Sequence, residues 1–325
     1  MSPGTVESLP TLFIILNAGS GHGDKAMIRA TIERVLTEAR RTCEMIVVED
    51  PRELSAIARR TVDAARARGG VVVAAGGDGT INTVAQATLG SGCAFGVLPQ
   101  GTFNYFGRRH GIPSDTAEAA RVLATARPHP VQVGLVNDRV FLVNASLGLY
   151  PRLLEDREAW KAQLGRSRLV AFAAGLVSLF RNRRQLHISL EHHSATRRIR
   201  TPTLFVGNNG LQLGEIGIPL ADAVDHGQLA AITLRPVGDF AMLWLLLRGA
   251  FGQLGDADNV VSCSFRSMTV KRVKLFRGRG IKVATDGEVA WLDEPLEFRV
   301  SPEPLQLLKP EPRDSSAPPS GSRSP

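Results

Sequence analysis

The chain has 325 residues, 43% of them hydrophobic, and a formal net charge of +8. This length allows two domains, and the composition is that of a globular protein rather than of a disordered or fibrous one. Three widely spaced cysteines, Cys43, Cys93 and Cys263, indicate a reducing compartment and no disulfide framework. We find no membrane-spanning run, no signal peptide and no nucleic-acid-binding signature, so the positive charge favours a phosphate-rich ligand or an anionic membrane.

Strand and helix patterns alternate over the first 130 residues. Short apolar runs predict strands, and apolar residues at helical spacing predict the helices between them. We expect strands at 12–16, 43–48, 71–75 and 94–98, and helices at 26–40, 53–68, 80–89 and 115–126. The last helix opens with a capping box in which Asp115 is the cap and Glu118 its partner. Such alternation predicts an α/β fold built on a parallel sheet.

Three of these strands end in small polar loops that contain glycine. The loops are Asn17-Ala18-Gly19-Ser20-Gly21, Gly76-Gly77-Asp78-Gly79-Thr80 and Gly101-Thr102-Phe103-Asn104. In an open parallel sheet, loops at the carboxyl ends of the strands gather at the place where ligands bind. The backbone N–H groups of such turns, with a helix N-terminus behind them, can hold a phosphate.

Asp78 is unexpected in a phosphate loop, because a carboxylate repels a bound anion. It fits if a divalent cation bridges the two, as in a Mg²⁺–nucleotide complex. The alternative is a tight strand–helix turn with Asp78 as the helix cap, since a single glycine-rich turn is a weak signal. A Walker A motif is absent. Lys25 could pair with a phosphate, but an exposed charge at a helix start is the simpler interpretation.

Beyond the segment at 128–131 the predicted elements are mostly strands. They are expected at 131–136, 139–144, 186–191, 197–206, 228–234, 264–275, 281–284 and 296–300. Short strands at this spacing predict an antiparallel, sandwich-like or barrel-like domain. We therefore expect a nucleotide-binding domain at 1–130, a β-rich substrate domain at 131–308 and, from its proline, serine and charge content, a disordered tail at 309–325.

Two apolar inserts interrupt the strands, at 152–182 and 239–254. Both are too short to span a bilayer and too apolar for ordinary surface helices. They fit helices packed on the second domain. A lipid-lined groove or an interfacial surface, with the arginines that flank the first insert meeting anionic head groups, is compatible with that packing.

The three glycine loops together resemble the nucleotide site of the diacylglycerol kinase catalytic-domain family, which includes bacterial lipid kinases and sphingosine kinases. The Gly-Gly-Asp-Gly-Thr loop is shared with NAD kinases, whereas the other two loops favour the lipid kinases. The resemblance extends through 144–149, 207–209 and 219–221 and covers roughly residues 11–300. It implies two domains with the active site in the cleft between them, and a chain end that returns to the first domain.

The resemblance also implies roles for individual residues. ATP would be bound by Asn17, Gly19, Ser20, Gly21, Gly76, Gly77, Asp78, Gly79, Thr80, Asn82, Gly101, Thr102 and Asn104. Mg²⁺ would be held by Asp78, and a structural ion by Asp225. Asp78 would also be catalytic, with Asp286 or Glu288 of an Asp-Gly-Glu segment as the proton acceptor. Taken alone, that segment is a common turn.

The chain departs from the family pattern in three places. Tyr105 stands where the family has an aspartate after Gly-Thr-x-Asn, and Thr83 stands where a glutamate follows the second loop. His226 replaces an aspartate beside Asp225, which bears on the structural metal.

The sequence thus predicts a Mg²⁺-dependent lipid kinase that transfers the γ-phosphate of ATP to a hydroxyl of diacylglycerol or a related lipid. We expect it in the cytoplasm, in peripheral contact with the anionic inner membrane surface, with no nucleic-acid partner; a homodimer is compatible. The alternatives are a soluble, NAD kinase-like enzyme and a catalytically silent protein that binds a nucleotide or a lipid.

Overall fold

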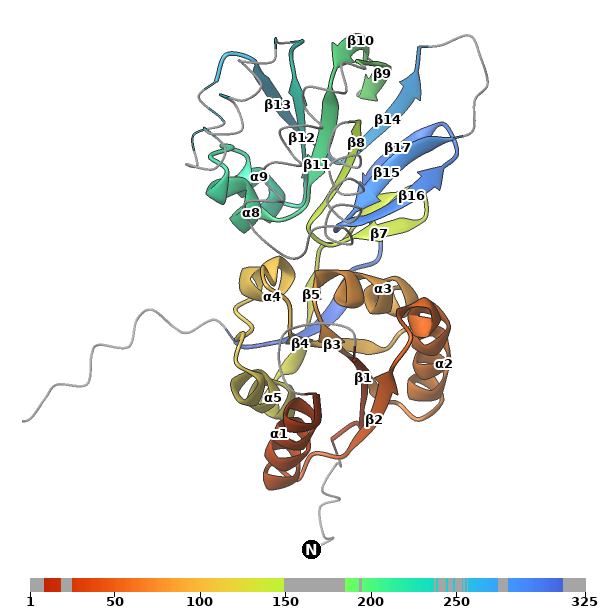
Figure 1. The fold of residues 1–325 in the computed structure, drawn as a ribbon, viewed down its shortest axis with the longest axis vertical. Coiled ribbons are helices and arrows are strands. Elements are labelled where there is room, and N and C mark those ends of the chain that lie inside the picture. Colours follow the sequence, from red (N-terminus) through yellow and green to blue (C-terminus); the bar gives the residue numbers. More distant parts are fainter. Residues whose placement is uncertain are drawn as a thin grey trace, which may run out of the picture.

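The computed structural model describes residues 9–18, 25–148, 185–192, 195–236, 238, 244, 248, 253, 255, 257–273 and 280–311. Several predictions lie outside these residues: the roles of Gly19, Ser20 and Gly21, the first apolar insert, most of the second and nearly all of the predicted tail. The described chain forms two bodies stacked along the long axis of the molecule (Figure 1). The lower body combines helices with one sheet, and the upper body consists mostly of strands.

The first sheet has six strands in the order β2-β1-β3-β4-β18-β5. Its strands are β1 (Leu12–Asn17), β2 (Cys43–Val48), β3 (Val71–Gly76), β4 (Ala94–Pro99), β5 (Arg127–Val131) and β18 (Leu305–Lys309). All neighbours are parallel except β18 and β5. Strands β1 and β3 are buried at every position, which explains why both read as continuous apolar runs. The α/β fold expected from the sequence is confirmed.

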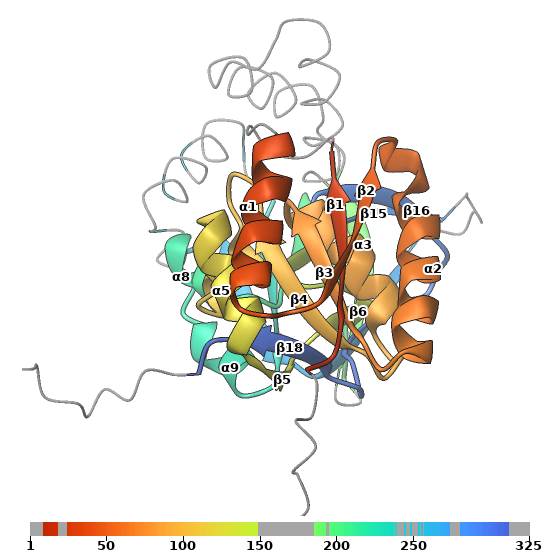
Figure 2. The same ribbon diagram turned by 90° about the horizontal axis from the view of Figure 1, so that it is seen from below.

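Helices cover both faces of this sheet. They are α1 (Lys25–Glu38), α2 (Leu54–Ala67) after the 3-10 turn η1 (Pro51–Glu53), α3 (Asp78–Thr88), α4 (Tyr105–Arg109) and α5 (Thr116–Thr125). Figure 2 shows α1 and α5 on one side of the sheet and α2 and α3 on the other. Asp115 caps α5 as predicted, because its Oδ1 accepts a hydrogen bond of 2.9 Å from the Glu118 N–H.

The upper body contains two antiparallel sheets, in the orders β10-β9-β14-β17-β6-β7 and β13-β12-β11-β8-β15-β16. The strands are β6 (Gly134–Val136), β7 (Arg139–Phe141), β8 (Asn144–Gly148), β9 (Leu186–His192), β10 (Ala195–Thr201), β11 (Thr203–Gly207), β12 (Leu229–Leu234), β13 (Val260–Phe265), β14 (Ser267–Arg272), β15 (Ile281–Thr285), β16 (Glu288–Leu292) and β17 (Leu296–Val300). Phe141, Leu147 and Phe298, drawn from both sheets, share one core. This arrangement confirms the predicted sandwich-like, β-rich part.

Two short helices cover the outer face of the second sheet. They are α8 (Gly210–Glu215) and α9 (Ala221–Asp225). Leu213 and Val224 from these helices form a small core with Ala230 and Ile232 of β12. The two helices therefore lie at the lower end of the upper body, facing α4 (Figure 1).

Several long predicted strands are divided in the structure. The stretch at 197–206 is split at Pro202, which has no N–H for the ladder, into β10 of one sheet and β11 of the other. The stretch at 264–275 is split at Arg266, where the chain again crosses from one sheet to the other. The stretch at 139–144 is broken at Leu142 and Val143, whose backbone N–H groups donate hydrogen bonds to the Asp286 carboxylate instead of to a strand.

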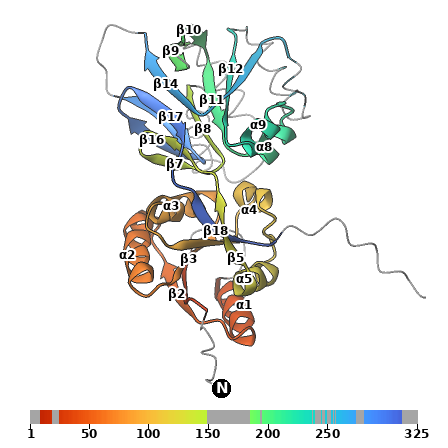
Figure 3. The same ribbon diagram turned by 180° about the vertical axis from the view of Figure 1, so that it is seen from behind.

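The chain end returns to the first sheet. Strand β18 lies between β4 and β5 and buries Leu305, Leu307 and Leu308 (Figure 3). Its partner β5 includes Pro128 and Pro130, which an edge strand tolerates because its outer side needs no N–H. The sequence-based division assigns 305–308 to the second domain, whereas their hydrogen bonds place them in the first sheet. The boundary near residue 130 itself stays a prediction.

Candidate active site

Two of the glycine loops close on each other at the carboxyl ends of β3 and β4. The Gln100 N–H donates to the Gly76 carbonyl at 2.8 Å. A methyl group placed on Gly101 would lie 3.0 Å from the Cα of Gly77, so this approach leaves no room for a side chain. The Gly76–Thr80 and Gly101–Asn104 loops therefore form one continuous surface.

Asn104 closes its own loop with its side chain. Its Oδ1 accepts from the Gly101 N–H and its Nδ2 donates to the Gly101 carbonyl, both at 2.9 Å. The backbone φ of 49° is left-handed, a conformation that asparagine adopts more readily than most residues. These two hydrogen bonds, the Asn104 clamp, explain why an asparagine ends the Gly-Thr-x-Asn sequence. Thr102 is exposed on the loop.

The first loop is tied to the second through a buried contact. Asn17 Nδ2 donates to Thr80 Oγ1 at 2.9 Å, which joins the end of β1 to the first turn of α3. Lys25 begins α1, directly after the part of this loop that lies outside the described residues. Its Nζ is buried and has no hydrogen-bond partner within the described part of the chain, and burial lowers the pKa of Lys25. The exposed-charge interpretation of Lys25 is therefore wrong.

The sequence predicts a helix that begins at Thr80, but α3 begins two residues earlier, at Asp78. Gly77 precedes it in an extended conformation, so the N–H groups of the first helical turn have no carbonyl partner within the helix. Asp78 Oδ1 lies 3.4 Å from the Phe106 N–H. Burial raises the pKa of Asp78, and the N–H groups of Phe106, Tyr105 and Asn104, with the charge of Arg108, act in the opposite direction.

Asp286 and Gly287 form the two-residue turn of the β15–β16 hairpin, with φ values of 48° and 93°. Asp-Gly is a preferred sequence where both positions need a positive φ. The Asp286 carboxylate also accepts four hydrogen bonds: Oδ2 from Asn82 Nδ2 and the Leu142 N–H, both at 2.7 Å, and Oδ1 from the N–H groups of Val143 and Asn144, both at 2.9 Å. The break between β7 and β8 supplies these three N–H groups.

These bonds give Asp286 a connecting role. Both oxygens are already used twice, so the carboxylate has no acceptor position left for a substrate hydroxyl. Burial raises the pKa of Asp286 to about 6, against the lowering effect of its four hydrogen bonds. Asn82 lies on α3 and also donates to the Val140 carbonyl at 3.0 Å. Asp286 and Asn82 together fix the hairpin of the upper body on α3 of the lower one.

Glu288 stands in a different environment, although it is only two residues away. Its side chain is exposed at the start of β16. A methyl group placed on Gly79 would lie 3.3 Å from Glu288 Oε1, so this carboxylate reaches the first turn of α3, next to Asp78. Glu288 also lines a groove of about 670 Å³ between α2 and α3 on one side and β7, β15 and β16 on the other, together with Asn82 and Trp291. A substrate in this groove has access to the Glu288 carboxylate.

A second set of contacts joins α4 to the upper body. Asp225 at the end of α9 is paired with Arg109, Arg108 pairs with Glu215 at 2.6 Å, and Asn209 Nδ2 donates to the Tyr105 carbonyl at 3.0 Å. Tyr105 itself stacks on Phe103 with ring centroids 5.7 Å apart. The predicted metal role of Asp225 stays a prediction, and the guanidinium that already neutralises its carboxylate weighs against it.

The donor set fits Mg²⁺ that arrives with a nucleotide. Among the described residues, no group of three His, Cys, Asp or Glu side chains lies together. Mg²⁺ at phosphoryl-transfer sites commonly uses one or two carboxylates and completes its shell with phosphate oxygens and water. Asp78 supplies one such carboxylate at the glycine loops, and Glu288 lies close by. The oxygen ligands present thus suit a hard divalent cation.

Sequence patterns did not reveal the residues that join the two bodies. Gln86 donates to the Asp138 carbonyl at 3.1 Å and accepts from the Val140 N–H at 2.8 Å. The contacts of Asn82 and Asn209 likewise connect residues far apart in the chain. Periodicity reports only neighbours along one element. The signal that could have found these residues is a pair of uncharged amide side chains one helical turn apart, as at Asn82 and Gln86.

Comparisons with known proteins show which family the chain is similar to. The diacylglycerol kinase catalytic domain matches residues 11–136. A probable lipid kinase, YegS-like, from Pseudomonas aeruginosa strain UCBPP-PA14 is 32% identical over 268 residues, which cover 78% of this chain and 81% of that protein. A probable lipid kinase of the same description from Klebsiella pneumoniae strain 342 is 42% identical over 98 residues, 29% of this chain and 33% of its own length.

The fold is also similar to a solved structure. A crystal structure of a diacylglycerol kinase from Bacillus anthracis strain Sterne superposes with a TM-score of 0.66, at 18% identity, and covers 93% of this chain and 97% of that one. At this identity the likeness concerns the fold. Within the part of the chain that the structure describes, no helix is both long enough and apolar enough to cross a membrane.

Proposed function

Because the chain belongs to the family of YegS-like probable lipid kinases, we propose that it transfers the γ-phosphate of ATP to a hydroxyl group of diacylglycerol or a related lipid. The observation that carries the proposal is the placement of Glu288, an exposed carboxylate that reaches Gly79 at the glycine loops. Phosphoryl transfer needs a held triphosphate, neutralised charge and a hydroxyl in line with the γ-phosphate. Residues of this chain are available for each of these tasks.

The nucleotide would lie along the carboxyl edge of the first sheet. The backbone N–H groups of Asp78, Gly79 and Thr80 belong to the first turn of α3, have no carbonyl partner within the helix and suit phosphate oxygens. Lys25 would pair with a phosphate, which would give its buried ammonium the partner it lacks. The remaining proposed nucleotide contacts are Asn17, Gly19, Ser20, Gly21, Gly76, Gly77, Asn82, Gly101, Thr102 and Asn104. Of these, Asn17, Asn82 and Asn104 would act mainly by holding the loops in place.

Asp78 would hold Mg²⁺, directly or through water. When bound, the ion would neutralise charge on the β- and γ-phosphate oxygens. Burial raises the pKa of Asp78, and the N–H groups at the start of α4 oppose this rise in favour of the ionised form that a metal requires. Removing Asp78 should therefore weaken the ATP complex in the presence of Mg²⁺ more than in its absence.

Glu288 would accept the proton of the lipid hydroxyl. It is exposed, and its carboxylate lies against the turn that would carry the γ-phosphate. Asp286, whose four acceptor positions are all occupied, would position the hairpin that carries Glu288. This assigns the two acids of the Asp-Gly-Glu segment to different tasks.

The lipid acceptor would be reached at the cytoplasmic surface of the inner membrane. The net charge of +8 favours peripheral contact with anionic lipids, and the two apolar inserts would contact the acyl chains. A homodimer is compatible with this arrangement, and no nucleic acid takes part in it.

The test is transfer of label from γ-labelled ATP, with Mg²⁺, to a panel of diacylglycerol, monoacylglycerol, ceramide, sphingosine and NAD in detergent micelles. Labelled diacylglycerol or another labelled lipid is the expected result. Label in NAD and in no lipid would point to a soluble kinase instead. Thermal stabilisation by ATP without any labelled product would point to a silent nucleotide-binding protein. Either of these two results would overturn the proposal.

A further inference from the structure

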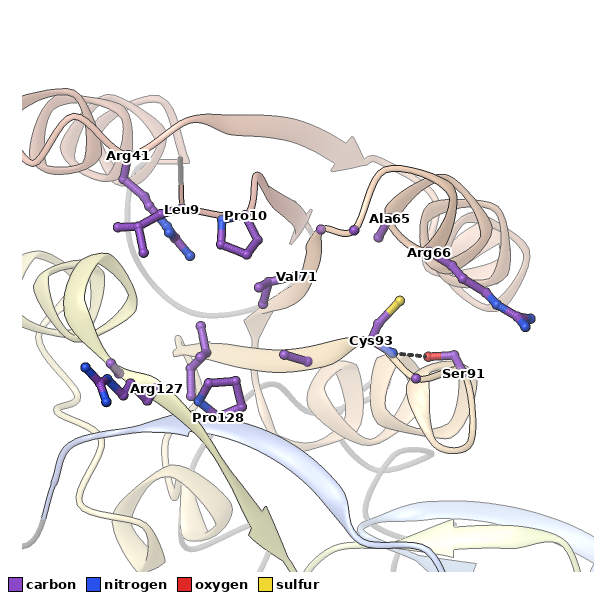
Figure 4. Close-up of a pocket in the computed structure, with 16 residues that line it drawn as sticks. Leu9, Pro10, Arg41, Ala65, Arg66, Val71, Ser91, Cys93, Arg127 and Pro128 are labelled. Carbon is purple, nitrogen blue, oxygen red and sulfur yellow. Dashed lines mark hydrogen bonds between the residues drawn. The ribbon is translucent and has the colours of Figure 1, made fainter. Parts of the chain in front are cut away.

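A second cavity, of about 640 Å³, lies at the edge of the first sheet opposite the glycine loops (Figure 4). Val71 and Ala94, the first residues of β3 and β4, line it, whereas the glycine loops follow the last residues of the same strands. The five steps along a six-residue strand, at about 3.3 Å each, separate the two places by about 17 Å. The cavity is therefore no part of the proposed active site.

Arg41 projects into this cavity. It follows the end of α1, where Arg40 has a φ of 54° and the Arg41 N–H donates to the Leu36 carbonyl at 2.8 Å. Only 6% of Arg41 is exposed, yet its Nε and Nη1 atoms are buried and have no hydrogen-bond partner among the residues that the structure describes. A guanidinium in this state is costly to bury, because it has left water without gaining an acceptor. An anion in the cavity would supply that acceptor.

The remaining lining of the cavity suits an anion with an apolar part. Leu9, Pro10 and Leu308 provide apolar wall, and the exposed residues Arg66 and Arg127 add positive charge at the rim. No acidic residue is found among the described residues that line it. The volume is within the usual range for sites that bind small molecules. Charge, shape and the unpaired guanidinium thus point to the same class of ligand.

We propose that this cavity is a second binding site, for a small molecule that carries a phosphate or carboxylate group. The oxygens of that group accept hydrogen bonds from the Arg41 guanidinium, whose planar fork of N–H groups suits phosphate and carboxylate. The apolar wall takes a short apolar portion of the same molecule. This inference stands on the cavity alone and is independent of the proposed kinase activity.

The test measures thermal unfolding of the full chain. A saturating non-hydrolysable ATP analogue is present, so that added phosphate cannot raise the Tm by binding at the glycine loops. The probes are inorganic phosphate, octanoate, dioctanoyl phosphatidate and, as the neutral control, dioctanoylglycerol. We expect at least one anion to raise the Tm of the wild type and dioctanoylglycerol to have no such effect. Binding of phosphatidate alone would identify a lipid head group, and binding of inorganic phosphate a free anion.

Two variants locate the effect. In Arg41→Gln the dissociation constant of the active anion should rise at least tenfold, whereas Arg60→Gln, which changes an exposed arginine of α2 that does not line the cavity, should keep it within about twofold. Without anion, Arg41→Gln should unfold at a higher temperature than the wild type, because an unpaired buried charge is removed. If Arg41→Gln does not fold, the dissociation constant is measured for Arg41→Lys instead, because lysine keeps the positive charge and lacks the fork of N–H groups. No response of the wild type to any anion, or equal affinity in the Arg41 variant that is measured, would overturn the proposal.

Discussion

Asp286 and Glu288 show how two carboxylates in one turn come to differ in chemistry. The left-handed Asp286-Gly287 pair turns the first carboxylate inward onto the N–H groups of Leu142, Val143 and Asn144, and leaves the second exposed on β16. The sequence indicates a turn and an acidic pair, but it cannot assign the two tasks. The donors for Asp286 come from more than 140 residues earlier in the chain. Only the fold reveals that Asp286 is saturated.

Truncation of Asp286 should destabilise the protein. Asp286→Ala leaves the N–H groups of Leu142, Val143 and Asn144 without their acceptor, so we expect a loss of about 3 kcal/mol in the free energy of unfolding. Urea denaturation measures this loss. The control is Asp293→Ala, an exposed acid in the same hairpin region, which should change stability by less than about 0.5 kcal/mol. Equal stability of the two variants would refute the connecting role of Asp286.

Asp286 should also make the stability of the protein depend on pH in a predictable direction. Its pKa is raised from 3.8 to about 6, so between these values the folded state binds more protons than the unfolded state. The contribution of Asp286 to the free energy of unfolding therefore falls as the pH rises from about 4 to about 6, and is level above that. The measurement is the difference in unfolding free energy between the wild type and Asp286→Asn across this range. A difference that rises with pH would have the wrong sign.

At the scale of elements, the site depends on where strands stop. Strand β3 ends at Gly76 and α3 begins at Asp78, which leaves only Gly77 between them. Both glycine loops were visible in the sequence, because glycine and asparagine are needed wherever the backbone turns sharply or approaches another segment. The helix start was predicted two residues late, since Asp78 and Gly79 looked like loop residues. Sequence patterns also missed α4, α8 and α9, which are too short for periodicity to detect.

The Asn104 clamp gives a prediction at this scale. Asn104→Ala removes both hydrogen bonds to Gly101 and should raise the KM for ATP about tenfold, while the kcat changes less. Asn104→Gly should raise the KM similarly, because it also lacks the clamp, but it should unfold at a higher temperature than Asn104→Ala since glycine tolerates the φ of 49°. Steady-state kinetics with varied ATP measures both values. A wild-type KM in Asn104→Ala would show that the clamp does not shape the nucleotide site.

At the scale of the whole molecule, two sets of contacts hold the bodies together around the glycine loops. One runs from Asn82 and Gln86 on α3 to β7 and Asp286, and the other from α4 to α8 and α9. The α/β and β-rich parts could be predicted from the change of pattern near residue 130. The return of β18 was implied only by the family resemblance, because its five residues carry no signal of their own for their partners in β4 and β5.

Two truncations test the return of the chain end. Deletion of residues 304–325 removes β18 and its three buried leucines, which should cost about 5 kcal/mol or more and abolish cooperative thermal unfolding. Deletion of 312–325 spares β18 and should leave the Tm within about 2 °C. Differential scanning calorimetry compares the two proteins. A cooperative transition at the wild-type Tm in the shorter chain would show that β18 is dispensable.

The central claim is that Glu288 serves a lipid hydroxyl at the glycine loops. Its most direct test is the rate of label transfer from γ-labelled ATP to diacylglycerol by the wild type, Glu288→Gln and, as the control, Glu297→Gln, an exposed glutamate on β17, the next strand along the chain. The account predicts labelled lipid with the wild type and the control, and a kcat lower by about 10² to 10⁴ in Glu288→Gln, with ATP binding and Tm unchanged. Wild-type turnover in Glu288→Gln, or no labelled lipid with any of the three proteins, would contradict it.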